Sequence, residues 1–205
     1  MEDLKMQLVV ARLCKVGQEE FVRFWSGKYS YAPEVAGLYE ENIGKPLDAG
    51  RVWALYRWKN GSKIIAEKKE RAIENTYIPE LGRLPRPQSR EEGRGYLSRL
   101  GGGAIWGIFW LHCIRRDMFP IFDQHTYRAM AKILGGVPSE IPPSRGKKVE
   151  AYFSQYLDFT SQFSVPPRRL DKALFARRLD KALFAYGRFL KKGFGGNKPC
   201  LTRKP

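Results

Sequence analysis

The sequence predicts an all-α protein, and three observations carry that prediction. Apolar residues recur at the spacing of a helix face through most of the chain, whereas the two-residue alternation of strands is almost absent. The helical stretches start at capping residues and stop at glycines or prolines. The chain has 205 residues, which is long enough for one domain with a hydrophobic core, or for one domain with an added lobe. Of these residues 43% are hydrophobic and 13% aromatic, which argues against disorder.

Five helices are expected in the N-terminal part of the chain. Asp48 is a candidate N-cap for the fourth of them, and Asn60-Gly61 stops it. The fifth alternates lysine with glutamate, which is typical of a solvated face, so no function is assigned to it. These helices are expected at residues 4–15, 19–25, 31–39, 50–59 and 64–77.

A stiff connector at residues 82–88 precedes the best-marked helix. Ser89 and Glu92 form a capping-box signature, and the helix that they begin runs to about Leu100. Three consecutive glycines, Gly101 to Gly103, then break it. Further helices are expected at residues 104–115, 123–134 and 147–163, followed by a last basic helix from Pro166-Pro167 to about residue 192.

The last helix contains an exact repeat. Residues 168–176 read RRLDKALFA, and residues 177–185 repeat that segment letter for letter. A shift of nine residues turns a helix by about 2.5 turns, so the second copy should present its leucine and phenylalanine on the opposite face. A structural repeat would keep its buried face. We therefore interpret this one as a recent tandem duplication, natural or artificial, or as a helix buried on two sides.

The strongest bulk signal is positive charge. The chain has 37 lysines and arginines against 21 aspartates and glutamates, a net charge of +16. The last forty residues, 166–205, contain 12 of the basic side chains and only 2 acidic ones. A charge this large indicates a polyanionic partner, with nucleic acid the first candidate and an anionic membrane surface the second.

Cysteine usage and the N-terminus indicate an intracellular protein. Cys14, Cys113 and Cys200 are far apart in sequence, so they form no zinc or iron–sulfur motif and suit a reducing compartment. The start of the chain lacks the basic and apolar pattern of a signal peptide. The longest apolar stretch, residues 104–114, is too short to span a bilayer. We expect a soluble protein of the cytoplasm, nucleoid or nucleus.

The glycine break carries the first chemical signal. Glycines allow a tight turn and a close approach of the backbone to a ligand. The amides that open the following helix carry partial positive charge, so this hairpin is a ready phosphate site. Arg94 and Arg99 before the turn would add attraction. A helix–glycine–helix element alone is nevertheless common in helical proteins.

The spacing downstream of the glycines is more specific. Gly101 lies 22 positions before Asp123, which opens the segment Asp-Gln-His-Thr-Tyr-Arg. The stretch resembles the helix-hairpin-helix core of the endonuclease III-type DNA glycosylases, in which an LPGVG-like hairpin is followed by a V-D-T-H-x-x-R segment. The resemblance covers residues 89–134, about a fifth of the chain.

The resemblance implies a fold and a function. The fold would be a two-lobed helical one, with an N-terminal lobe at residues 1–88, the helix-hairpin-helix core at 89–134, and C-terminal helices with a basic tail at 135–205 packing on the same unit. The function would be base excision from duplex DNA by a monomer, with the target base flipped out and Asp123 stabilising the oxocarbenium-like state. The implied DNA-binding residues are Arg99, Gly101, Gly102, Gly103, Ala104 and His125.

Several positions have alternative interpretations. Asp123 could simply be a helix N-cap, which is compatible with catalysis because a cap holds the carboxylate rigidly. His125 is expected to be structural or close to DNA. Arg128 could hold backbone or a carboxylate, or be solvated. His112 lies in an apolar helix and is expected to be a satisfied core residue.

The sequence also departs from the family. Ile105 stands where bifunctional members have a Schiff-base lysine, which favours a monofunctional hydrolase. The four-cysteine iron–sulfur motif is missing, so neither a cofactor nor a metal is expected. Trp53, Tyr56 and Trp58, interleaved with Arg57 and Lys59, are candidates for stacking a flipped base, although aromatic residues at helical spacing are more often core.

Three functions therefore remain open. The first is a monofunctional DNA glycosylase, and the second is a catalytically inactive helix-hairpin-helix module that binds or senses DNA. The third is a helical protein whose basic tail meets a membrane or an acidic partner. The third ignores the central motif and ranks last.

Overall fold

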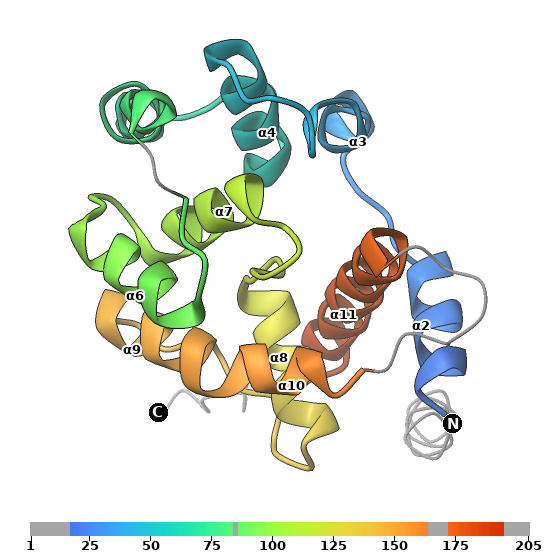
Figure 1. The fold of residues 1–205 in the computed structure, drawn as a ribbon. Coiled ribbons are helices and arrows are strands. Elements are labelled where there is room, and N and C mark those ends of the chain that lie inside the picture. The colour runs from blue at the N-terminus through green and yellow to red at the C-terminus, as the bar shows by residue number, and fades with distance from the viewer. Residues whose placement is uncertain (1–16, 84–85, 164–171, 195–205) are drawn as a thin grey trace, which may run out of the picture. The chain divides into compact units, whose positions relative to one another are not determined.

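A computed structural model of the chain describes residues 17–83, 86–163 and 172–194. Within these ranges every regular element is a helix and there is no strand, so the all-α prediction is confirmed (Figure 1). The helix expected at residues 4–15 and the Pro166-Pro167 start of the last helix lie outside the described residues. None of the described helices combines the length and apolar character needed to cross a membrane.

The chain forms two compact units that interleave along the sequence. Of the described residues, unit 1 contains 17–29, 123–141 and 178–194, and unit 2 contains 30–83, 86–122, 142–163 and 172–177. These boundaries do not follow the expected segments 1–88, 89–134 and 135–205. The reason is long-range pairing: residues near the two ends of the chain pack together, which a segment-by-segment interpretation cannot detect.

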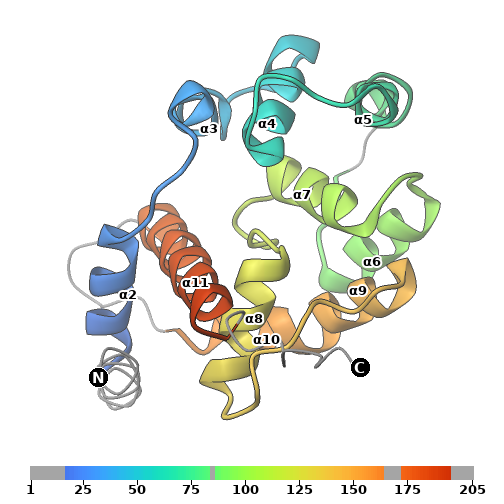
Figure 2. The same ribbon diagram turned by 180° about the vertical axis from the view of Figure 1, so that it is seen from behind.

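Unit 1 is built on aromatic packing between α2 (Gln18–Gly27) and the later part of α11 (Lys172–Phe194). Both views show these two helices side by side (Figures 1 and 2). The ring of Tyr186 lies 5.4 Å from that of Phe21 and 5.0 Å from that of Trp25. The third helix, α8 (Gln124–Ile133), meets α11 at Gly187, where a Cβ atom would lie only 1.9 Å from the carbonyl oxygen of His125. Glycine is therefore required at this contact.

The repeat in α11 behaves as its phase predicts. Leu174 of the first copy is 53% exposed, whereas Leu183 at the equivalent position of the second copy is fully buried. The phenylalanines show the reverse, since Phe175 is buried and Phe184 is half-buried. The two copies present opposite faces, so the repeat is not a structural repeat.

Unit 2 contains the remaining helices. Asp48 caps the fourth expected helix by accepting from the amide of Arg51, and Gly61 ends it with a φ of 76°. Two stretches expected as single helices contain a π-helical segment each, at 73–77 and 152–156. The elements are η1 (Pro33–Val35), α3 (Leu38–Asn42), α4 (Ala49–Asn60), α5 (Glu67–Ala72), η2 (Ile73–Tyr77), η3 (Pro79–Gly82), α6 (Arg90–Arg99), α7 (Ala104–Ile114), α9 (Arg145–Ala151), η4 (Tyr152–Tyr156) and α10 (Leu157–Ser161).

The core of unit 2 is centred on α7. Its residues 108–111 are all buried, and Phe109 packs edge-on against the ring of Tyr56. A helix that is apolar on all sides is one that must be surrounded by others. In Figure 1, α7 lies between α4 and α6. The α6–α7 pair is therefore anchored by a largely buried helix.

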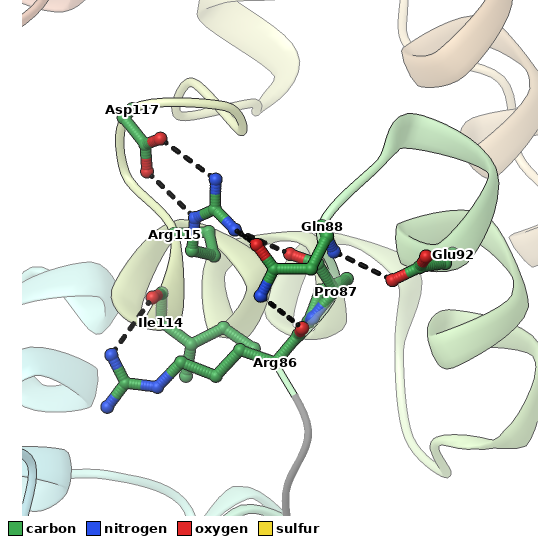
Figure 3. Close-up of polar contacts among 7 residues, drawn as sticks. All are labelled: Arg86, Pro87, Gln88, Glu92, Ile114, Arg115 and Asp117. Atoms are coloured by element: carbon green, nitrogen blue, oxygen red, sulfur yellow. Dashed lines mark hydrogen bonds and ion pairs between the residues drawn. The ribbon is translucent and has the colours of Figure 1, made fainter.

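The connector before α6 is pinned to the C-terminal end of α7 (Figure 3). Arg115 donates to the carbonyl oxygen of Pro87 at 2.9 Å and to the side-chain oxygen of Gln88 at 2.8 Å. The amide of Gln88 donates to Glu92, so this glutamate reaches back one residue further than a capping box requires. Ser89 does cap α6, accepting from the amide of Glu92 at 3.0 Å. The end of the α6–α7 pair opposite the glycine turn is thus fixed by hydrogen bonds.

Candidate functional site

The glycine turn joins α6 to α7 in the predicted helix–turn–helix form. Gly101, Gly102 and Gly103 are exposed, and Ala104 is buried as the first residue of α7. Gly102 has a φ of 83°, and a Cβ atom there would lie 3.2 Å from the hydroxyl oxygen of Tyr77. A side chain at this position would be strained and crowded, so the turn requires glycine at its middle position.

The N-terminus of α7 has no side-chain cap. Gly103 is the N-cap residue, and the first helical hydrogen bond runs from the amide of Gly107 to its carbonyl oxygen at 2.9 Å. The first turn contains no acidic residue. The amides that open α7 therefore carry partial positive charge without a carboxylate of the same helix to neutralise it.

Basic side chains lie on the helix before this turn and against the helix after it. Arg99 is exposed and makes no ion pair among the described residues. Arg94 is paired with Glu150, so part of its charge is compensated. Lys69 places its ammonium group 5.4 Å from the ring centre of Trp106 in the first turn of α7. The exposed turn and Arg99 form a surface that attracts anions.

A basic residue that sequence reasoning missed contacts the turn directly. Arg145, at the start of α9, donates to the carbonyl oxygens of Leu97 at 2.6 Å, Leu100 at 2.8 Å and Gly102 at 3.1 Å. No local pattern signals this role, because the arginine lies more than forty residues after the carbonyls that it binds.

Asp123, in unit 1, is the N-cap of α8. One carboxylate oxygen accepts from the amides of His125 at 2.8 Å and Thr126 at 3.1 Å. The hydroxyl of Thr126 in turn accepts from the amide of Asp123 at 2.9 Å, which completes a capping box. The cap interpretation is confirmed, and it holds this carboxylate in one orientation.

His125 is half-buried beside Asp123. Its ring lies 4.8 Å from the ring of Phe184, with the two planes 67° apart. Burial is the main cause that lowers its pKa, and the charges of Arg128, Lys191 and Arg188 lower it further, while Asp123 opposes them. The imidazole is therefore mostly neutral at pH 7.

Arg128 is buried and holds unit 1 together locally. Its guanidinium donates to the carbonyl oxygen of Gly187 at 3.2 Å and to Glu140 at 2.5 Å, and it lies 3.4 Å from Nδ1 of His125. The arginine of the Asp-x-His-x-x-Arg segment thus binds both backbone and a carboxylate. The alternative of a solvated arginine is wrong.

The other histidine is a core residue, as expected. His112 is 3% exposed; its Nδ1 lies 2.7 Å from the carbonyl oxygen of Phe119, and its Nε2 lies 2.7 Å from the hydroxyl of Tyr39. A carbonyl can only accept, so Nδ1 carries the proton and Nε2 accepts from the tyrosine. Burial lowers the pKa of His112 to about 3.

The predicted stacking surface requires correction. Tyr56 is fully buried and Trp58 is 4% exposed, because α4 turns both toward the core of unit 2. Only Trp53 is half-buried, and the guanidinium of Arg57 lies 5.4 Å from its ring centre. Tyr56 and Trp58 are core residues in this structure, and the aromatic interleaving of α4 does not form a stacking face.

The structure groups the predicted site residues in two places. Arg99, Gly101, Gly102, Gly103 and Ala104 lie together in unit 2, and Asp123 lies with His125 in unit 1. Within the described ranges, no group of three or more His, Cys, Asp or Glu side chains is placed to hold a metal ion. The one cysteine of these ranges, Cys113, is buried, and burial raises the pKa of its thiol.

Comparison with known proteins adds no relative: no family model, no curated protein and no solved structure matches this chain.

Proposed function

We propose that this protein binds duplex DNA through the α6–α7 hairpin and hydrolyses the N-glycosidic bond of a damaged or mispaired base. The observation that carries the proposal is the pair of helix starts at the spacing of the motif. An exposed, uncapped glycine turn opens α7, and a rigidly capped aspartate opens α8 22 positions after Gly101. The net charge of +16 supports a polyanionic partner.

The hairpin supplies the binding chemistry. The amides at the start of α7 are donors for phosphate oxygens, and Arg99 adds a charge beside them. Contacts of this kind position a duplex without reading its sequence. His125, next to Asp123 and mostly neutral, is proposed to lie close to the DNA rather than to transfer a proton.

Asp123 supplies the catalytic chemistry in this proposal. The bond between C1′ of the sugar and the base nitrogen breaks, and its electron pair leaves with the base. Positive charge develops on the sugar, where a fixed carboxylate stabilises it. The oxygen of a water molecule then bonds to C1′, and its proton leaves to the carboxylate or the departing base. Ile105 in place of a lysine fits hydrolysis rather than Schiff-base chemistry. The proposal uses no cofactor.

A second function is a DNA-binding module without base excision. It is favoured by the engagement of Asp123, whose carboxylate already accepts two amide hydrogen bonds as an N-cap. In this alternative the aspartate has a structural role only, and the hairpin alone provides the activity.

Base release distinguishes the two functions. Duplexes containing uracil, thymine mismatches, oxidised bases or alkylated bases are incubated with the protein, and abasic sites are cleaved with hot alkali. Asp123→Asn is the key variant, because asparagine caps a helix about as well as aspartate and so keeps the fold. Its expected rate of base release is lower by about 10²–10⁴-fold, with DNA affinity unchanged.

Asp48→Asn is the matched control, since Asp48 is also an N-cap carboxylate but belongs to α4. It should release base at the wild-type rate. Tight DNA binding by the wild type without release of any base would favour the binding module. Equal rates for the wild type and Asp123→Asn would remove Asp123 from the mechanism.

A further inference from the structure

Arg145 is exposed and contacts the glycine turn on the side of its carbonyl oxygens. Its guanidinium takes three carbonyl oxygens, two from the C-terminal end of α6 and one from the turn itself, at 2.6 to 3.1 Å. The last carbonyls of a helix have no partner within the helix and carry partial negative charge. A planar guanidinium offers five donors in a fixed fork and suits several carbonyls at once, whereas an ammonium group offers three donors from a single point.

The hydrogen bonds of Arg145 fix the direction of the neighbouring amides. In a trans peptide the C=O and N–H groups point in opposite directions. Because the carbonyls of Leu100 and Gly102 point at Arg145, the amides of Gly101 and Gly103 in the same two peptide planes point away from it. Both glycines are exposed, and neither amide donates a backbone hydrogen bond within the described part of the chain.

We propose that Arg145 is the positioning residue of the DNA-binding hairpin: it holds the turn so that its amides, together with those that open α7, face a phosphate. This inference rests on the proposed DNA-binding function. Arg145 is itself exposed, and its Nε and Nη2 groups donate to the three carbonyls; in this proposal it acts through the turn and not through a contact with the DNA. Arg99, exposed and without an ion pair among the described residues, is the residue that adds its charge to the contact.

The two roles predict different salt dependence. A side chain that contacts a phosphate releases counterions when the DNA binds. Its removal therefore reduces the steepness with which log K falls against log salt concentration by about 1. A side chain that only shapes the turn changes the affinity and leaves that slope unchanged, provided the remaining phosphate contacts persist. DNA affinity measured at several salt concentrations therefore separates a direct contact from a positioning residue.

The experiment compares four variants with the wild type on an undamaged duplex. Arg145→Ala should bind about tenfold more weakly at every salt concentration, with the wild-type slope. Arg145→Lys should recover part of the affinity, because an ammonium can satisfy some of the carbonyls. Arg99→Ala should bind more weakly with a slope lower by about 1. Lys147→Ala removes a neighbouring charge from α9 that does not contact the turn, and should change affinity less than twofold.

A second measurement tests the geometry without DNA. In ¹⁵N-labelled free protein, Arg145→Ala should shift the amide signals of Gly101 and Gly103, whereas Arg99→Ala and Lys147→Ala should leave them in place. If Arg145→Ala does not fold, DNA affinity and the glycine amide signals are measured for Arg145→Lys, in which both should change in the same direction by a smaller amount.

The outcomes separate this inference from the proposed function. A wild-type protein that does not bind duplex DNA removes the proposed function, while the glycine signals still report whether Arg145 shapes the turn. A slope lowered by about 1 in Arg145→Ala, with glycine signals unmoved, makes Arg145 a direct contact and overturns the positioning role. Wild-type affinity and wild-type glycine signals in Arg145→Ala overturn it equally.

Discussion

The starts of α7 and α8 solve the same physical problem in opposite ways. Each helix begins with amides that have no helical partner. At α7 the cap residue is Gly103, so the amides stay available to an external anion. At α8 the cap residue is Asp123, whose carboxylate accepts two of the amides and is held rigidly by them. A helix start that lacks a side-chain cap is suited to bind a phosphate, and one that supplies its own anion is suited to orient a carboxylate.

The start of α8 is also the more tightly packed of the two. Gly187 of α11 leaves no room for a Cβ atom, which would lie 1.9 Å from the backbone oxygen of His125. Gly187→Ala should therefore force α8 and α11 apart and destabilise the protein by about 3 kcal/mol. Urea denaturation measures the change.

Gly27→Ala provides the control for Gly187→Ala. Gly27 ends α2 in the same unit, and a Cβ atom there meets nothing within 4 Å. The change in its unfolding free energy should stay below about 1 kcal/mol. Equal unfolding free energies for the Gly187 and Gly27 variants would show that α11 does not press on the start of α8.

The buried histidine of α7 makes the stability of the protein depend on pH. His112 of α7 has a pKa of about 3 because it is buried, whereas an unfolded chain would titrate near 6.5. Between these two pKa values His112 is therefore neutral in the native state and protonated in the unfolded state. The contribution of this neutral histidine to the free energy of unfolding is fully present above about pH 6.5 and is lost as the pH falls toward 3.

His112→Gln tests this contribution. Glutamine can still bond to the carbonyl of Phe119 and the hydroxyl of Tyr39, but it does not titrate. Between about pH 6 and 4 the wild type should lose up to about 1.4 kcal/mol more stability per pH unit than the variant. Unfolding free energies at pH 7, 5.5 and 4 provide the measurement, and parallel pH profiles would contradict the assignment.

The glycines of the α6–α7 pair should respond in opposite directions. Gly102→Ala forces a φ of 83° on a residue with a side chain and brings it against Tyr77, so about 1–2 kcal/mol of stability should be lost. Gly95→Ala lies inside α6, where a Cβ atom meets only the flexible end of Arg99 at 3.8 Å, and should stabilise the protein by about 0.5–1 kcal/mol. Thermal denaturation of both variants checks the signs, and stabilisation by Gly102→Ala would contradict the left-handed turn.

Local features of the chain could be predicted from the sequence, because caps and turns depend on neighbouring residues. Asp48, Ser89 and Asp123 cap the helices that their patterns indicated, and the three glycines form the expected turn. The phase of the repeat likewise predicted that the two copies present their leucine and phenylalanine on opposite faces.

Long-range features could not be predicted, because they depend on which segments meet. Arg145 binds carbonyls more than forty residues earlier in the chain, and Arg128 binds the backbone of Gly187. The burial of Tyr56 and Trp58 follows from the packing of α4, whose aromatic residues alone do not indicate which face is covered. The interleaved units have the same origin.

A substitution at Gly103 can convert the start of α7 into a start like that of α8, and so tests whether the hairpin binds phosphate. Gly103 has an ordinary φ of −81° and open space around its Cβ position, so Gly103→Asp and Gly103→Asn should both fold and cap α7. Duplex DNA affinity is measured for both variants at several salt concentrations. The aspartate is expected to occupy the amides and repel phosphate, so that Gly103→Asp binds at least about tenfold more weakly than the neutral Gly103→Asn at low salt. Equal affinities for the two variants would contradict a phosphate site at the hairpin, and with it the proposed mode of DNA binding.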